Sequence, residues 1–112
     1  MPIFISQGRY SRDAMQAMVR NPEDRTKPVS KLIEAPGGGL LGYYVTFGDY
    51  DWLLIVEAPD VRSAAAAAIT AAAGGGVTDM KTTLAMTEAE AMEAFRSAGS
   101  LAASYRLAGQ SV

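Results

Sequence analysis

The segment YYVTFGDYDWLLIVEAP, residues 43–59, places two carboxylates and a tyrosine between two apolar runs. Asp49 and Asp51 flank Tyr50, and Trp52, the single tryptophan of the chain, follows directly. A carboxylate in a partly dry cleft can have a raised pKa and then act as a general acid or base. The residue types therefore fit an active site, but Gly48 and Asp49 between apolar runs equally fit a turn.

Histidine and cysteine do not occur among the 112 residues. Without histidine the chain has no Ser-His-Asp triad, no imidazole base, no ordinary zinc site and no histidine-ligated haem. Without cysteine it has neither disulfides nor thiol catalysis. Asp and Glu could in principle form an oxygen-only metal site, but the sequence has no clustered acidic loop of the EF-hand type. We therefore expect no metal and no cofactor.

The charge balance and the apolar segments limit the partners. The net charge is −2, and no long run of Lys or Arg provides the basic patch of a nucleic-acid groove. The opening MPIFISQGRY has no basic region before a long apolar segment, so it does not read as a signal peptide. The alanine-rich run at 63–73 is too short to span a bilayer. We expect a cytoplasmic protein that binds neither nucleic acid nor membrane.

The residues around the acidic segment predict a β-hairpin. Residues 40–47 and 50–57 read as strands, and Gly48-Asp49 is typical of a two-residue type II′ turn. This register pairs Phe47 with Tyr50, Thr46 with Asp51, Val45 with Trp52, and Tyr43 with Leu54. One face is then continuously large and apolar, and it carries Leu41, Tyr43, Val45, Phe47, Tyr50, Trp52, Leu54 and Val56. The other face is mixed, and it carries Leu40, Gly42, Tyr44, Thr46, Asp51, Leu53, Ile55 and Glu57.

Local signals place the remaining elements. Residues 2–8 and 77–86 read as strands, and Ser11 is a suitable N-cap for a helix that Pro28 should break or kink within 20–28. A second helix runs from Pro59-Asp60 to the glycines at 74–76. It should face the hairpin with Val61, Ala64, Ala65, Ala68, Ile69 and Ala72.

A capping box, Thr87 with Glu90, begins a third helix. Its apolar side carries Ala91, Met92, Phe95, Ala98 and Ala102. The order β-α-β-β-α-β-α predicts an α+β fold, a ferredoxin-like sandwich with an added C-terminal helix. The glycine runs at 37–39 and 74–76 follow helices, so they are interpreted as C-caps and turns rather than phosphate loops, which open helices.

The chain resembles the GYD-domain family in FISQGRYS near its start, in PEDR, in Gly48-Asp49-Tyr50-Asp51 and in GGGVTDMKTTLAMT. The resemblance covers residues 1–95 and leaves 96–112 as the rest of the C-terminal helix and the tail. It implies a dimeric α/β barrel, in which two ferredoxin-like sheets pack face to face and enclose a cleft. The family is largely uncharacterised, so the resemblance implies a fold more firmly than an activity.

The sheet itself also favours a homodimer. Helices can cover one side of it, and the other side carries Tyr44, Leu53 and Ile55, which are too apolar to leave in water. The candidate ligand-binding residues around the resulting cleft are Tyr44, Thr46, Asp51, Lys81 and Arg9. For Asp51 two interpretations stay open: a group that contacts a ligand, or a solvated or structural acid that pairs with Arg9 or Lys81.

Three functions follow from these observations. The first is a homodimer that binds a small organic molecule in the inter-sheet cleft. The second is a structural or assembly module without chemistry. The third, by analogy of fold, is a cofactor-independent oxygenase or isomerase, which would need Asp51, Tyr44 or Lys81 as its base. The sequence does not decide whether the protein is an enzyme.

Overall fold

The computed structural model describes residues 1–110. Within this range the chain forms four strands and four helices. In chain order they are β1 (Ile3–Tyr10), α1 (Arg12–Arg20), α2 (Thr26–Glu34), β2 (Gly39–Val45), β3 (Trp52–Glu57), α3 (Val61–Ala73), β4 (Val77–Ala85) and α4 (Glu88–Ala102).

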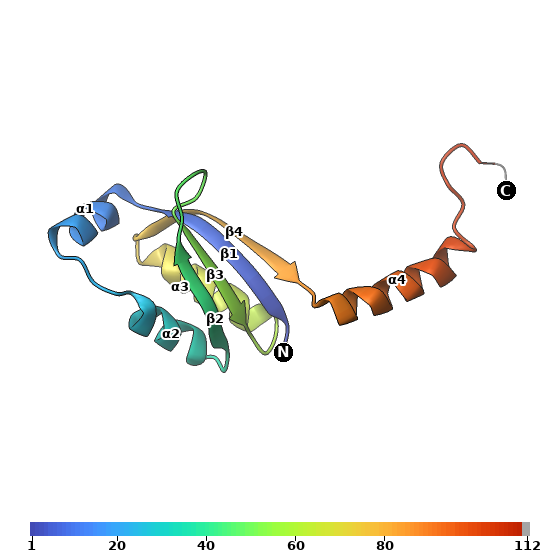
Figure 1. Ribbon diagram of the computed structural model, residues 1–112, viewed down its shortest axis with the longest axis horizontal. Coiled ribbons are helices and arrows are strands. Elements are labelled where there is room, and N and C mark those ends of the chain that lie inside the picture. Colours follow the sequence, from blue (N-terminus) through green and yellow to red (C-terminus); the bar gives the residue numbers. More distant parts are fainter. Residues whose placement is uncertain (111–112) are drawn as a thin grey trace.

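The strands form one antiparallel sheet in the order β2-β3-β1-β4, with α2 and α3 packed on one face (Figure 1). This arrangement confirms the predicted ferredoxin-like α+β fold. The core lies between the sheet and these two helices, where burial of apolar side chains stabilises the fold. Its buried members are Phe4, Ile33, Val56, Ala58 and Ala67.

The hairpin keeps its predicted register near the turn. Val45 pairs with Trp52 and Tyr43 with Leu54, and the Thr46 N–H donates to the Asp51 carbonyl at 2.8 Å. The prediction of a two-residue turn is wrong, however. Strand β2 ends at Val45 and β3 begins at Trp52, so a longer loop, residues 46–51, connects them. The hydroxyl of Thr46 donates to the Tyr50 carbonyl at 2.7 Å, which replaces the next step of the ladder. Phe47 consequently lies 99% exposed rather than in the core.

A β-bulge near the start of β2 reverses the faces of the sheet on which its first side chains lie. The register shifts between Leu40 and Gly42, so an extra residue is inserted opposite β3. Leu40 packs against the core and Leu41 is exposed, the reverse of the prediction. A bulge depends on the partner strand, which alternation within one segment does not reveal.

The predicted break within 20–28 is confirmed, since α1 ends at Arg20 and α2 begins at Thr26. Pro28 therefore lies in the first turn of α2, where backbone N–H groups have no helical acceptor. The Val29 N–H, directly after Pro28, donates to the Arg25 carbonyl at 3.1 Å. The proline thus costs no hydrogen bond.

The inward face of α3 agrees with the predicted one at Ala64 and Ala68 and differs from it elsewhere. Val61 and Ile69 are both 66% exposed, while Ala67 is buried and Ala64 packs against the core. Alanines occur on nearly every side of α3, so its sequence shows little difference in hydrophobicity between one face and another. The small side chains face the sheet, and the bulkier ones point outward.

The capping box of α4 is confirmed by hydrogen bonds between Thr87 and Glu90. The helix extends away from the sheet (Figure 1), and the molecule measures 65 × 31 × 22 Å. Its radius of gyration is 18.5 Å, against about 13 Å for a compact chain of this length. Met92, Phe95 and Leu101 are therefore exposed. Across residues 1–110, the helices are all too short or too polar to cross a membrane.

Candidate functional site

Asp51 is half-buried and joins two strands. Its carboxylate accepts the Tyr10 backbone N–H at 2.9 Å, and its own N–H donates to the Gly8 carbonyl at 2.8 Å. These contacts tie the start of β3 to the end of β1, where β1 has a second bulge against β4. The carboxylate therefore satisfies a backbone donor of β1 that lies beyond the last β1–β3 pair, Gly8 with Trp52.

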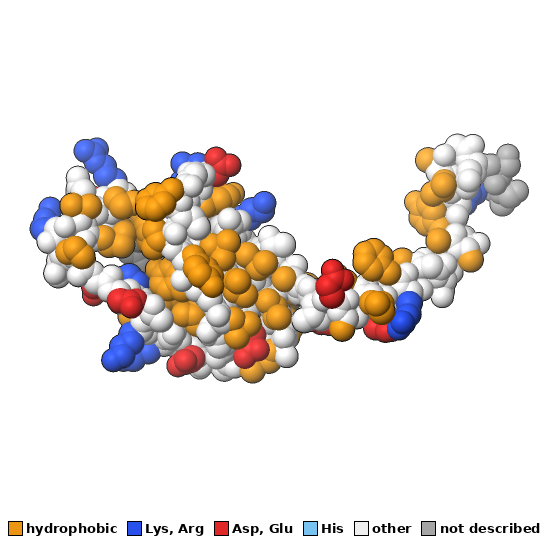
Figure 2. All heavy atoms as spheres, viewed as in Figure 1, with side chains coloured by type: hydrophobic (Ala, Val, Ile, Leu, Met, Phe, Trp, Pro, Cys, Tyr) orange, Lys and Arg blue, Asp and Glu red, His pale blue; other side chains and the backbone are white. Residues whose placement is uncertain are grey.

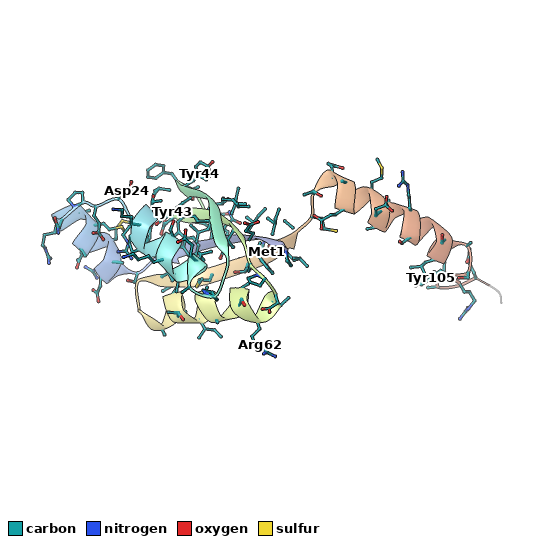
Figure 3. The ribbon with its side chains drawn as sticks, turned by 90° about the horizontal axis from the view of Figure 1, so that it is seen from below. Met1, Asp24, Tyr43, Tyr44, Arg62 and Tyr105 are labelled. Atoms are coloured by element: carbon teal, nitrogen blue, oxygen red, sulfur yellow. The ribbon has the colours of Figure 1, made fainter. Side chains whose placement is uncertain are left out.

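Tyr44 and Lys81 lie at opposite edges of the open face of the sheet, the face without helices. The strand registers form one row, Tyr44–Leu53–Gln7–Lys81, that crosses all four strands. Three strand spacings separate its ends by about 14 Å. In Figure 3, Tyr44 points away from α3, whereas Tyr43 lies toward the helices. Within one chain, the predicted ligand residues Tyr44 and Lys81 do not form a common site.

The two other predicted site residues are also separate. Arg9 is exposed beyond the β1 bulge, opposite Thr78. The hydroxyl of Thr46 donates a hydrogen bond to the Tyr50 carbonyl. The five candidates thus divide into groups that hold the backbone and groups that project into solvent. Across the described residues no cluster of three or more Asp or Glu could hold a metal ion.

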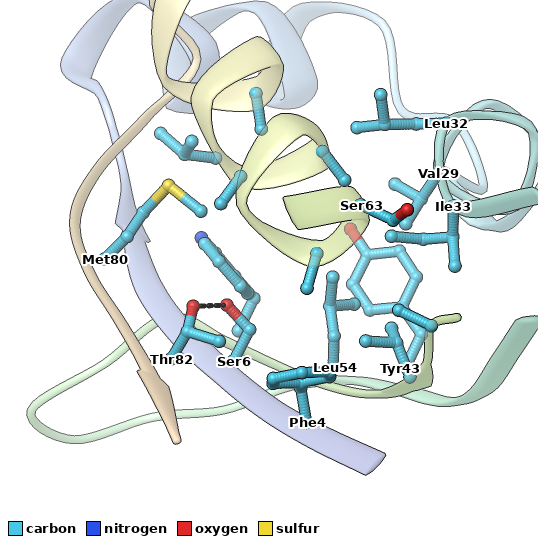
Figure 4. Close-up of a pocket in the computed structure, with 18 of the residues that line it drawn as sticks. Phe4, Ser6, Val29, Leu32, Ile33, Tyr43, Leu54, Ser63, Met80 and Thr82 are labelled. Atoms are coloured by element: carbon cyan, nitrogen blue, oxygen red, sulfur yellow. Dashed lines mark hydrogen bonds between the residues drawn. The ribbon is translucent and has the colours of Figure 1, made fainter. Parts of the chain in front are cut away.

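A cavity of about 100 Å³ lies instead on the covered side, between the sheet and helices α2 and α3 (Figure 4). Apolar side chains of the core form most of its wall. The residues that line it include no Asp, Glu, Lys or Arg. The sequence reasoning missed this cavity, although the run of alanines in α3 was a signal, because short side chains leave space beside a sheet.

Two hydroxyl pairs line the cavity. The Tyr10 and Tyr43 hydroxyls are 3.1 Å apart, and those of Ser6 and Thr82 are 3.0 Å apart. Burial, followed by the hydrogen bond to Tyr43, raises the pKa of Tyr10 far above its ordinary range. Tyr10 is therefore protonated at neutral pH and can donate or accept a hydrogen bond, but it does not act as a base.

Trp52 supplies a different kind of polar group. The side chain is 4% exposed, and its Nε1 has no hydrogen-bond partner among the described residues. The indole ring lies against Gly8, where an added Cβ would come within 2.4 Å of Cζ2. Glycine at position 8 thus makes room for the ring, which also lines the cavity. The prediction that Trp52 belongs to the core is correct.

Comparison with known proteins gives a family and a fold. The family model described as GYD domain matches residues 4–95. The glutamine synthetase and cystathionine beta-lyase binding protein of Thermus thermophilus is 35% identical over 66 residues, which span 58% of this chain and 68% of that protein.

Two solved structures share the fold at low identity. An AsnC family transcriptional regulator from Agrobacterium tumefaciens superposes with a TM-score of 0.53 at 21% identity, covering 78% of this chain and 51% of the regulator. The protein MtbAldR superposes with a TM-score of 0.55 at 14% identity, covering 78% of this chain and 52% of that one. The chain therefore spans about half the length of these two structural relatives.

Proposed function

The chain belongs to the GYD domain family, and we propose that it works as a homodimeric binding module that engages other proteins and performs no chemistry itself. One observation carries the proposal: the fold leaves the open face of its sheet uncovered, and that face is apolar at its centre. Ile5, Leu53 and Ile55 occupy adjacent strands there. Figure 2 shows apolar side chains gathered over the sheet and again along α4.

A second copy of the chain is the simplest cover for this face. A twofold axis would stack two such sheets and remove both apolar faces from water. The helix α4 supports the same proposal, because Met92 and Phe95 have no apolar surface of their own chain to cover them. An apolar helix that leaves its own domain gains stability by packing on a partner.

Binding to other proteins rests on the relative from Thermus thermophilus, whose name states that it binds two enzymes. A ligand in the inter-sheet cleft receives less support, because Thr46 and Asp51 already bond to backbone groups. Catalysis receives the least, since the candidate base Asp51 is held by Tyr10. We also propose that the GYD-type domain ends near residue 95, inside α4.

Light scattering after size exclusion tests the dimer. We expect a mass of about twice the 11.8 kDa of one chain. Ile55→Lys places a charge at the centre of the open face and should shift the protein to monomer, because burying an unpaired charge is unfavourable. The matched control, Ile69→Lys, changes an exposed position of α3 and should leave the dimer intact.

A second pair of variants tests whether α4 contributes to the dimer. Phe95→Glu should weaken the dimer, whereas Ser97→Glu, on the other side of the same helix, should not. Circular dichroism confirms that each variant is folded. A wild-type protein that stays monomeric at tens of micromolar, or a dimer that tolerates Ile55→Lys, contradicts the proposal. Titration with the glutamine synthetase of the organism that encodes this chain then tests the proposed binding to enzymes.

A further inference from the structure

The open face of the sheet also determines how two copies of the chain stack, and this inference rests on the proposed homodimer. A twofold axis in the plane between two stacked sheets runs either along the strands or across them. We propose that it runs along the strands, so that Lys81 of each chain lies on the ring of the partner's Tyr44. Each of these two contacts is complete only in the dimer.

The strand registers define two rows of residues on the open face. The first row is Tyr44–Leu53–Gln7–Lys81, and the second, one step along the strands, is Gly42–Ile55–Ile5–Thr83. Both rows cross the sheet in the strand order β2-β3-β1-β4. A twofold axis along the strands therefore reverses each row and lays it on the same row of the partner.

With the axis along the strands, apolar side chains meet at the centre of the stack. Ile5 of one chain lies against the partner's Ile55, and the same contact repeats on the other side of the axis. At each edge of the first row, Lys81 lies opposite the partner's Tyr44. Aligned sheets cross at about 30°, which at about 7 Å from the axis moves an edge residue by roughly 4 Å. The flexible four-carbon stem of lysine spans that shift.

With the axis across the strands, charged groups meet apolar side chains instead. Each strand then lies on its own copy with its direction reversed. When the axis passes through the apolar second row, Lys81 falls opposite the partner's Ala85, and Glu57 falls opposite the partner's Leu53. Both charges would be covered without a group of opposite charge, which is unfavourable. The positions of the charges therefore favour the axis along the strands.

Tyr44 and Lys81 are both available for a contact with a second chain. The Tyr44 side chain is 59% exposed, and it points away from α3 (Figure 3). Its ring extends over Gly42, where an added Cβ would come within 3.1 Å of Tyr44 Cε2. Lys81 is exposed and has no salt bridge within the described residues. A lysine ammonium group over an aromatic ring is a favourable contact, and it strengthens when water is excluded.

The C-terminal helix supports the same axis. Helix α4 begins two residues after β4 ends, and it leaves the sheet at one end (Figure 1). An axis along the strands places both copies of α4 at the same end of the stack. The exposed side chains of Met92 and Phe95 on the two helices are then close enough to cover one another. An axis across the strands sends the helices to opposite ends and leaves both uncovered.

Chemical cross-linking tests the axis, because the chain has no cysteine and introduced thiols are the only ones. The double variant Tyr44→Cys/Lys81→Cys is treated with a short bismaleimide. The reagent spans the about 10 Å between stacked sheets but not the about 14 Å between these two positions in one chain. We expect covalent dimers on a denaturing gel. Each single variant should run as a monomer, because its two thiols lie at opposite edges of the stack.

The variant Thr83→Cys tests the other axis. If the axis crosses the strands through the second row, two copies of Thr83 face one another and this single variant cross-links. If the axis runs along the strands, Thr83 lies opposite the partner's Gly42 and no cross-link forms. Adding Ile55→Lys to the double cysteine variant should abolish its cross-linking, because that change separates the chains.

The strength of the contact is measured by analytical ultracentrifugation. Lys81→Met and Tyr44→Leu should each raise the dimer dissociation constant about five- to thirtyfold, since each removes both copies of the contact. The double variant should be no weaker than either single variant, because both remove the same interaction. Lys81→Arg should keep the dimer, since a guanidinium group also stacks on an aromatic ring. Arg62→Met, at an exposed position of α3, is the matched control and should have no effect.

Three outcomes overturn the proposal. Cross-linking of Thr83→Cys alone assigns the axis across the strands. Additive effects of Lys81→Met and Tyr44→Leu, or a double cysteine variant that is dimeric by light scattering yet forms no covalent dimer, separate the two residues. Each of these results leaves the proposed homodimer intact. A wild-type protein that is monomeric overturns the homodimer and this contact together.

Discussion

The indole ring of Trp52 lies so close to Gly8 on the neighbouring strand that a Cβ atom there would come within 2.4 Å of Cζ2. The ring fills the space that a side chain at position 8 would occupy, an arrangement known to support glycine in a sheet. The pair joins β1 to β3 on the core side, beside the backbone bond between Gly8 and Asp51.

Gly8→Ala should lower the free energy of unfolding by about 1–3 kcal/mol, because the added methyl group displaces the indole ring from a packed site. Urea denaturation followed by Trp52 fluorescence measures the change. Gly99→Ala is the matched control: Gly99 lies inside α4, and among the described residues no atom other than the adjoining backbone lies within 4 Å of its Cβ position. That change should not destabilise the protein, since alanine is the better helix former. Equal stability of the two variants would contradict the packing argument.

Asp51→Ala should destabilise the protein by about 1–3 kcal/mol, because it leaves the backbone N–H of Tyr10 without its acceptor. Asp51→Asn should cost less, since the amide oxygen can still accept. Asp49→Ala, an exposed position in the same loop, should change the stability by no more than about 0.5 kcal/mol. The measurement is again chemical denaturation, and an effect of Asp49→Ala as large as that of Asp51→Ala would speak against the proposed contact.

Stability should fall at alkaline pH through Tyr10. Below the ordinary tyrosine pKa of 10.0 the phenol is neutral in both the folded and the unfolded chain, so its contribution is constant. Above that pH the unfolded chain loses the proton while the folded chain keeps it, because burial raises the folded pKa. The free energy of unfolding should therefore decline by less than about 1.4 kcal/mol per pH unit, since partial exposure weakens the effect.

The pH dependence has a direct optical test. Titration of the native protein at 295 nm should show one of its five tyrosines resisting ionisation. Tyr10→Phe should remove that resistant group and flatten the alkaline loss of stability, whereas Tyr44→Phe, at an exposed position, should alter neither. A wild-type titration in which all tyrosines ionise together near pH 10 would refute the prediction.

Thr87→Ala should unwind the start of α4 without unfolding the domain. The variant loses the hydroxyl that accepts the Glu90 N–H, a cap worth about 1 kcal/mol. Because α4 extends away from the sheet of its own chain, this loss falls on the helix and on the proposed dimer contact of Phe95, not on the core. Backbone chemical shifts of 88–102 should move toward coil values, while the strand residues keep their β-sheet shifts. Thr83→Ala, exposed on β4, is the control for α4 helicity.

Several features could be predicted from nearby residues alone. The caps at Ser11, Asp60 and Thr87 act within three positions of themselves, so they mark helix starts in any context. The break before α2 follows from a proline that tolerates only a first turn. The pairing of Val45 with Trp52 follows from counting outward from the turn predicted at Gly48-Asp49. These local rules were enough for the fold class.

The candidate site depended on contacts between distant segments. Asp51 binds Tyr10, 41 residues earlier in the chain. The cavity exists because alanines of α3 face the sheet, whereas their own sequence made Val61 and Ile69 equally suitable for that side. The bulge at Leu41 exchanged two leucines between core and solvent. Periodicity within one segment assigns its residues to two faces, but packing against other segments selects the face that is buried and the space left beside it.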